Sequence, residues 1–239
     1  MNNNFKYYEN DFELAVLDIF SKNDWRYECG YDIHRENNEI ILKKDFLEYL
    51  NNRYGSFSNN ELESIIRNLT IIQSQSLYRS MKETYTKLIK GYELSRDDGS
   101  KLFVEYIDFA SVDNNNFKVV NQFEYSEYKD RRPDILAFIN GIPVSVFELK
   151  NPADETVSIK DAYDQTHIRY SQDIPSLMKF DFINVISDGA NTRYGSLFSS
   201  YEFYFKWNST DGDNYYNSDI IDVDLDELRA ETDGIGTLN

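Results

Sequence analysis

Asp134, Glu148 and Lys150 interrupt an otherwise apolar stretch of the chain, RRPDILAFINGIPVSVFELK at residues 131–150. Charged groups inside apolar strands are costly unless they are paired or contact a ligand. Two neighbouring carboxylates suit Mg²⁺, which prefers oxygen ligands and is often shared between carboxylates and phosphate. Bound Mg²⁺ can supply a hydroxide-like nucleophile, and a lysine can orient the attacking water or stabilise charge on the phosphate. The three residue types therefore predict phosphodiester hydrolysis.

The stretch is predicted to form two strands joined at Asn140-Gly141, a dipeptide typical of hairpin turns. Loop length decides which side chains share a face of the sheet. A two-residue loop would place Asp134 opposite Phe147, so that Asp134 and Glu148 would point to opposite faces. A three-residue loop would place both carboxylates on one face. We therefore expect an odd loop here; a two-residue turn without a bulge would separate the two carboxylates.

The same residues resemble a known nuclease motif. Pro133-Asp134, followed by Glu148-Leu149-Lys150, is similar to the PD-(D/E)xK pattern. Glu148 and Lys150 are two residues apart, so on a strand they share one face. The motif implies a restriction-endonuclease-like α/β core, in which helices flank a central mixed sheet.

The sequence around this motif, from about Glu9 to Trp207, resembles the N-terminal nuclease domain of type I restriction enzyme R subunits. The similarity lies in RPD, then FINGIPVSVFELKNP, then Gln165 and Tyr170, then VISDG. It implies a metal-dependent endodeoxyribonuclease that leaves 5′-phosphate and 3′-hydroxyl products. We expect residues 1–207 to be this nuclease domain, followed at 208–239 by an acidic, partly flexible linker towards absent motor domains.

The resemblance also implies the metal ligands. Asp134, Glu148 and the Leu149 carbonyl would hold Mg²⁺, and Lys150 would place the attacking water. In this family an acidic residue on the first helix often joins the metal site, and Glu13 is the candidate here. A solvated glutamate is the alternative for Glu13.

The first helix itself is predicted over residues 9–23. Phe12, Val16, Ile19 and Phe20 recur at helical spacing and should form its apolar face.

A second site-bearing helix should begin at the capping box of Ser158 and Asp161 and run to about Tyr170. In the resembled family a Gln and a Tyr on this helix contact substrate beside the metal, which assigns Gln165 and Tyr170. Four residues separate them here, rather than the three of the usual motif. Residues five apart do not share a face of a regular α-helix, so this departure concerns the assignment of Tyr170 and leaves that of Gln165 unaffected. His167 is assigned a structural role.

The remaining elements are predicted from periodicity and caps. Capped helices should form a helical insert over about 44–90, placed before the sheet, with a capping box at Ser58 and a stop at Gly91. The insert should serve as scaffold or as a surface for partner domains, and its lysines (Lys82, Lys87 and Lys90) are assigned to a solvated face rather than to DNA. Strands are expected at 102–107, 117–125, 182–187 and 203–207, the first two joined by a turn at 114–116.

Three polar positions near the motif have two interpretations each. Arg131 and Arg132 could contact phosphate or form salt bridges at the rim of the site. Asp188 could bind a ligand or close a turn at a strand end.

Charge and composition limit the partners. The net charge is −17, and residues 208–239 hold nine acids but only one base, Arg229, so the remainder is also acidic. Nucleic-acid binders usually carry a basic footprint, so we expect weak DNA affinity from this chain alone. The resemblance implies that double-stranded DNA is held by ATP-driven motor domains outside this chain, together with modification and specificity subunits. No GxxxxGK[ST] loop occurs here.

The single cysteine, Cys29, fits a reducing cytoplasm. No apolar run reaches membrane-spanning length, so no membrane role is expected.

Two other functions stay open. One is a self-sufficient nuclease or resolvase on the same fold, which a basic groove or DNA affinity of the isolated chain would favour. The other is a binding module without catalysis, which loss of Asp134, Glu148 or Lys150 would have indicated.

Overall fold

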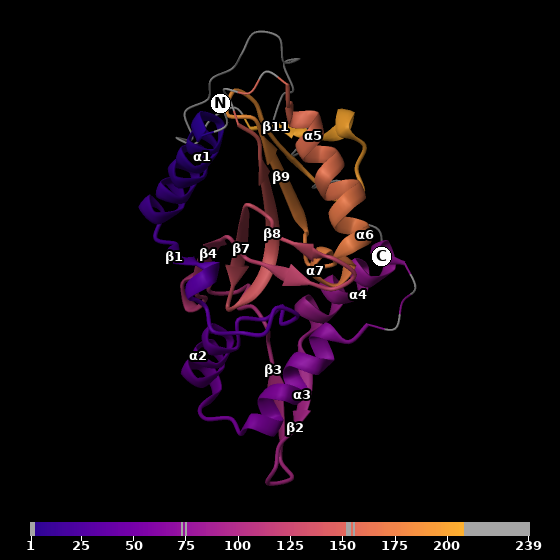
Figure 1. The fold of residues 1–239 in the computed structure, drawn as a ribbon. Coiled ribbons are helices and arrows are strands. Elements are labelled where there is room, and N and C mark those ends of the chain that lie inside the picture. The colour runs from indigo at the N-terminus through magenta and orange to yellow at the C-terminus, as the bar shows by residue number, and fades with distance from the viewer. Residues whose placement is uncertain (1–2, 73, 75, 152–153, 155, 208–239) are drawn as a thin grey trace, which may run out of the picture. The chain divides into compact units, whose positions relative to one another are not determined.

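A seven-stranded mixed sheet organises the residues up to Lys206 (Figure 1). The computed structural model describes residues 3–72, 74, 76–151, 154 and 156–207, with the backbone alone for 3–10. In spatial order the strands are β1 (Arg26–Cys29), β4 (Phe117–Asn121), β7 (Ile135–Ile139), β8 (Ile142–Leu149), β9 (Ile183–Ser187), β10 (Thr192–Gly195) and β11 (Phe205–Lys206). The pairs β1–β4 and β8–β9 are parallel, and the other neighbours are antiparallel. The expected α/β fold with a mixed sheet is confirmed, whereas the predicted acidic linker lies outside the described residues.

Alternate strand side chains divide the core between the two faces of the sheet, as the two-residue period of a strand requires. Ile135 and Phe147 pack on one face with Leu17 of α1 (Asn3–Lys22). Leu136 and Val146 pack on the other face, within a larger cluster that includes the buried side chains of three helices. These helices are α2 (Lys43–Tyr54), α3 (Asn59–Thr70) and α4 (Leu77–Lys90). No helix in the described part of the chain is long and apolar enough to cross a membrane.

The remaining elements are short. A later helical run consists of α5 (Ile159–Asp164), η3 (Gln165–Tyr170), α6 (Ser171–Asp173) and α7 (Pro175–Met178). Single 3-10 turns occur at η1 (Gly30–Asp32), η2 (Val112–Asn114) and η4 (Tyr201–Phe203), and two small ribbons pair β2 (Tyr92–Ser95) with β3 (Lys101–Val104) and β5 (Tyr125–Ser126) with β6 (Asp130–Arg131).

The predicted first helix is present, but one residue of its apolar face is not buried. Among the described side chains of α1, Leu17 is the deeply buried apolar one, with Phe12, Val16 and Phe20 partly buried beside it. Ile19 is instead 43% exposed. The prediction for Ile19 was wrong because the buried face of α1 is centred on Leu17.

Helix caps are confirmed at two predicted positions. The Ser58 side chain accepts from the Glu61 amide, the Glu61 carboxylate accepts from the Ser58 amide, and Gly91 follows α4 with φ of 69°. The helical segment is not an insert placed before the sheet, however. β1 precedes it and pairs with β4 inside the sheet, and the helices share the main core.

The structure differs from the sequence predictions for Lys87 and for the strand at 102–107. Lys87 is not simply solvated, because its ammonium donates to the carbonyls of Asn68 and Ile71 at 2.7 and 3.1 Å. The strand expected at 102–107 ends at Val104 and pairs with β2 in a separate ribbon, so it does not join the sheet beside β4.

The hairpin of β7 and β8 has a two-residue turn, so the expected odd loop was wrong. Asn140 and Gly141 both have positive φ, 52° and 74°, and Ile139 pairs with Ile142 directly across them. A bulge corrects the register, because Phe138 pairs with Pro143 while Ala137 pairs with Ser145. Val144 is therefore the extra residue of β8. The bulge does what the odd loop was expected to do, since beyond it the register returns Asp134 and Glu148 to the same face.

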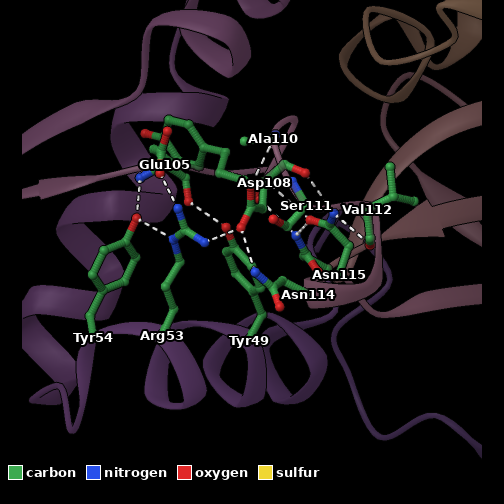
Figure 2. A network of polar contacts seen from close by, with 12 residues as sticks. Tyr49, Arg53, Tyr54, Glu105, Asp108, Ala110, Ser111, Val112, Asn114 and Asn115 are labelled. Atoms are coloured by element: carbon green, nitrogen blue, oxygen red, sulfur yellow. Dashed lines mark hydrogen bonds and ion pairs between the residues drawn. The ribbon is translucent and has the colours of Figure 1, made fainter.

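A polar network centred on Asp108 is linked through Asn115 to the Asn140-Gly141 turn, and Figure 2 shows the contacts of Asp108 within it. The Asp108 carboxylate accepts from the Ser111 amide at 3.0 Å and the Asn114 side chain at 2.8 Å, and it is paired with Arg53. These hydrogen bonds and the Arg53 charge lower the pKa of Asp108 to about 2. Asn115 is anchored to Asp108 through two hydrogen bonds of 2.9 Å.

Asn140 is bonded to this network and to the neighbouring strand. Its side chain donates to Asn115 Oδ1 at 2.8 Å and to the Tyr106 carbonyl at 3.1 Å, and it accepts from the Asn116 amide at 2.8 Å. A side chain at the next position, Gly141, has no room, because a Cβ there would lie 2.5 Å from the Leu42 carbonyl oxygen. The start of the hairpin, and hence its register, is therefore held from outside the strands.

Candidate active site

The two carboxylates of the motif lie next to each other at the open end of the hairpin. Ile135 pairs with Phe147, so the next position in this register sets Asp134 beside Glu148. The Asp134 carboxylate accepts a hydrogen bond of 2.6 Å from the Leu149 amide. Burial, and then the negative charge of Glu148, raise the pKa of Asp134 well above its usual range. Such a pair of acids favours either a bound proton or a bound cation.

Four predicted side chains form a closed ring of hydrogen bonds beside Asp134. The Lys150 ammonium donates to Glu148 Oε1 at 2.8 Å and to Gln165 Oε1 at 3.0 Å. The Gln165 amide donates to the Tyr170 hydroxyl at 2.8 Å, and that hydroxyl donates to Glu148 Oε2 at 2.9 Å. The structure thus brings together all five residues that the sequence assigned to catalysis.

A π-helical turn places Tyr170 in the ring. Residues 165–170 continue α5 as the π-helix η3, and Figure 1 shows α5, η3 and α6 as one continuous helix. The wider turn absorbs one extra residue, so Gln165 and Tyr170 face the same side although five positions separate them. Tyr170 therefore lies beside Gln165, as the resemblance implied, whereas Arg169, which a regular helix would place on the Ala162 face, is exposed. The extra residue between Gln165 and Tyr170 was the sequence signal for this turn.

Glu13 lies close to the carboxylate pair. Its side chain is 4% exposed, so the alternative of a solvated glutamate was wrong. It accepts from the side chains of Asn121 at 2.5 Å and Gln122 at 3.2 Å, and its charge adds to the causes that raise the pKa of Asp134. Sequence reasoning missed Asn121 and Gln122, whose partner lies more than a hundred residues away on α1.

The carboxylates of Asp134 and Glu148 fit a Mg²⁺ site with few protein ligands. Within the residues that the structure describes, no group of three or more His, Cys, Asp and Glu side chains is arranged around a metal position. Mg²⁺ needs no such cage, since it is commonly bound by one or two carboxylates, substrate phosphate and several waters. Asp134 and Glu148 supply two carboxylates, and burial together with the Glu148 charge raises the pKa of Asp134, which favours a bound proton or cation there. The Leu149 carbonyl as a third ligand stays a prediction.

His167 and Asp188 have structural roles. The His167 ring stacks on Tyr163 with centroids 3.6 Å apart, its Nε2 lies 3.1 Å from the Ser199 carbonyl, and burial lowers its pKa. Asp188 accepts from the amides of Ala190 and Asn191 at 3.1 and 2.7 Å and so closes the turn after β9.

The two arginines before the motif differ in their partners. Arg131 pairs with Asp173 through hydrogen bonds of 2.8 and 2.5 Å, which confirms the rim salt bridge for this residue. Arg132 is exposed, donates to the Tyr31 hydroxyl and has no acidic partner among the described residues. Its carbonyl lies 3.4 Å from the Tyr170 hydroxyl, so its backbone borders the ring.

Known proteins resemble this chain over most of its length, close to the range from about Glu9 to Trp207 expected from the sequence. The family described as the type I restriction enzyme R protein N terminus matches residues 6–203. A protein of Methanocaldococcus jannaschii described as the type I restriction enzyme MjaIXP endonuclease subunit is 32% identical over 225 residues, which cover 89% of this chain and 21% of that protein. The HindI endonuclease subunit of Haemophilus influenzae is 26% identical over 245 residues, which cover 95% of this chain and 22% of that subunit.

The chain thus spans about a fifth of the length of these two relatives. The EcoprrI endonuclease subunit of Escherichia coli is 26% identical over 228 residues, which cover 83% of this chain and 71% of that subunit. Because the family match includes the carboxylate pair, the ring and most of the sheet, the chain belongs to the family of type I restriction enzyme R protein N-terminal regions.

Proposed function

We propose that this chain is the Mg²⁺-dependent, PD-(D/E)xK-type endodeoxyribonuclease domain of a type I restriction-modification R subunit. The observation that carries the proposal is the closed ring of Glu148, Lys150, Gln165 and Tyr170 beside Asp134. A ring that positions an ammonium against a carboxylate pair suits hydrolysis of a phosphodiester, because that reaction needs a positioned nucleophile and stabilisation of negative charge.

Each residue has a role in this proposal. Asp134 and Glu148, with the Leu149 carbonyl, hold Mg²⁺, which when bound supplies Lewis acidity towards the phosphate and lowers the pKa of a water. Lys150 orients the attacking water and stabilises charge developing on the phosphate. Gln165 and Tyr170 keep the Lys150 ammonium and the Glu148 carboxylate in place, and Gln165 contacts the scissile phosphate.

Arg132 is the candidate contact to the DNA backbone. It is exposed, borders the ring and has no carboxylate partner among the described residues, whereas its neighbour Arg131 is neutralised by Asp173. An arginine with free donors suits phosphate recognition. The acidic chain otherwise needs DNA to be delivered, which we assign to motor domains outside this chain and to modification and specificity subunits.

Titration of Mg²⁺ into the purified chain by calorimetry, followed by cleavage of supercoiled DNA by the complete enzyme, tests this proposal. Lys150→Ala should keep the heat of Mg²⁺ binding but lose cleavage, because the lysine is not a ligand. Asp134→Ala should lose both. Identical isotherms and identical cleavage in all three proteins would show that this centre is not a nuclease site, as expected for a binding module of the same fold.

A further inference from the structure

Asp181 is a fully buried carboxylate in the segment between α7 and β9, and the chemistry proposed above does not use it. It is 0% exposed, and no Lys or Arg of the described residues forms an ion pair with it. Two donors satisfy it: the Val146 amide at 2.9 Å and the Asn184 side chain at 2.7 Å. Its burial raises its pKa to about 7. Buried carboxylates are costly, so this one needs a reason in the structure.

The first contact holds the bulge of β8. Val146 lies between the bulge residue Val144 and the predicted metal ligand Glu148. Asp181 accepts from the Val146 amide, and the next residue, Phe182, donates its amide to the Val144 carbonyl at 3.1 Å. Residues 181 and 182 therefore bracket the bulge that sets the register of Glu148 against Asp134.

The second contact leads to the π-helical turn. Asn184, also fully buried, accepts at Oδ1 from the Thr166 and Tyr204 hydroxyls, both at 3.1 Å. The Thr166 hydroxyl also lies 3.1 Å from the Tyr163 carbonyl oxygen and 3.4 Å from His167 Nδ1, so the bond to Asn184 competes with these two neighbours. Thr166 is fully buried and directly follows Gln165 in η3.

We propose that Asp181 is a positioning residue that aligns the two irregular elements of the site, the β8 bulge and the π-helical turn. Through Val146 it fixes the strand that carries Glu148 and Lys150. Through Asn184 and Thr166 it fixes the turn that carries Gln165 and Tyr170. Among the described residues, the hydrogen bonds of Asp181 go to Val146 and Asn184 and not to these four side chains, so it acts through its neighbours. This inference rests on the proposed nuclease function.

A matched set of conservative variants tests the link without removing the buried carboxylate. Thr166→Val removes only the hydroxyl that joins η3 to Asn184, and Thr166→Ser keeps it. Thr84→Val is the control, because Thr84 is also fully buried on a helix and its hydroxyl donates to the Ser80 carbonyl at 2.9 Å, within α4. Thr166→Val and Thr84→Val should cost similar global stability.

Hydrogen exchange of the backbone amides of residues 165–171 in the purified chain gives the first readout. Loss of the link should speed their exchange about fivefold in Thr166→Val, the factor for one hydrogen bond, with wild-type exchange in Thr166→Ser and Thr84→Val. Unchanged exchange in Thr166→Val would overturn the inference, whatever the enzyme does.

DNA cleavage by the complete enzyme gives the second readout. Misplacement of Gln165 and Tyr170 should lower kcat of Thr166→Val about 10- to 100-fold with KM unchanged, whereas Thr166→Ser should restore kcat. A wild-type kcat in Thr166→Val would overturn the positioning role alone. An inactive wild-type enzyme would overturn the proposed function, and the exchange experiment would still report whether the link exists.

Discussion

The Gln165 side-chain amide donates a 2.8 Å hydrogen bond to the Tyr170 hydroxyl, although five positions on a regular α-helix would separate the two side chains by about 140°. The π-helical turn makes this contact by absorbing one residue after Gln165. Such turns occur mostly as single bulges and often at functional sites. The contact explains how Gln165 and Tyr170 join one ring although four residues separate them.

Deletion of Ile168 should therefore be tolerated. Ile168 is 52% exposed within η3, and its removal leaves three residues between Gln165 and Tyr170, which an α-helix places on one face. We expect DNA cleavage within about threefold of wild type, since the ring would be kept. Deletion of Lys160 from α5 is the matched control, because it rotates both ring residues by about 100° and should abolish cleavage. Loss of cleavage after deletion of Ile168 alone would contradict the role given to the π-helical turn.

Asp134 should destabilise the metal-free protein at neutral pH. Its pKa is raised in the folded state, so its contribution to the free energy of unfolding is fully present below the usual pKa of 3.8 and is lost as pH rises through the raised value. In EDTA at pH 7.5, Asp134→Asn should therefore raise Tm, because it should increase the free energy of unfolding by about 1–3 kcal/mol. This gain should shrink towards pH 4. Addition of Mg²⁺ should raise Tm of wild type but not of the variant. Scanning calorimetry at several pH values checks both effects, and an equal Mg²⁺ response in the two proteins would argue against a metal at Asp134.

Gly141→Ala should be more harmful than a similar change at another glycine with positive φ. A Cβ at Gly141 would lie 2.5 Å from the Leu42 carbonyl oxygen, whereas a Cβ at Gly99, which has φ of 84°, would meet nothing within 4 Å. We expect Gly99→Ala to cost about 1 kcal/mol for the left-handed backbone, and Gly141→Ala to cost roughly 3 kcal/mol because overpacking is added. Urea denaturation measures both. Equal losses would mean that the packing of the turn against α2 does not constrain the hairpin.

Arg131→Gln and Arg132→Gln should separate stability from DNA contact. Arg131 neutralises the nearly buried Asp173, so its loss should lower stability by about 1 kcal/mol with little change in cleavage. Arg132 has no acidic partner among the described residues, so its loss should leave Tm unchanged and slow cleavage by about tenfold. Thermal melts of the chain and cleavage rates of the complete enzyme distinguish the two. A slower rate for Arg131→Gln and a normal one for Arg132→Gln would reverse the assignment.

Local signals predicted much of this structure, and distant contacts explain what they missed. The capping boxes at Ser58 and Ser158 act within three residues, so they could be read from the sequence. The bulge at Val144 could not, because it is held by Asp181 and Phe182, which lie in the segment that leads into the neighbouring strand β9. In the same way, the π-helical turn is anchored by Asn184, which belongs to β9. The candidate site was predicted residue by residue because its motif is local, but its two aligning irregularities depend on residues far along the chain.

The decisive measurement is cleavage of supercoiled DNA by the complete enzyme carrying Asp134→Asn, compared with a complex carrying Asp188→Asn. Asp188 is the matched control, since its carboxylate only closes a turn whose geometry asparagine can reproduce. ATP hydrolysis in both complexes shows that assembly and translocation are intact. If Asp134 holds the metal, Asp134→Asn should lower cleavage by at least about 100-fold, while Asp188→Asn should cut at the wild-type rate. Normal cleavage by Asp134→Asn would contradict a metal-dependent nuclease centre at this carboxylate pair.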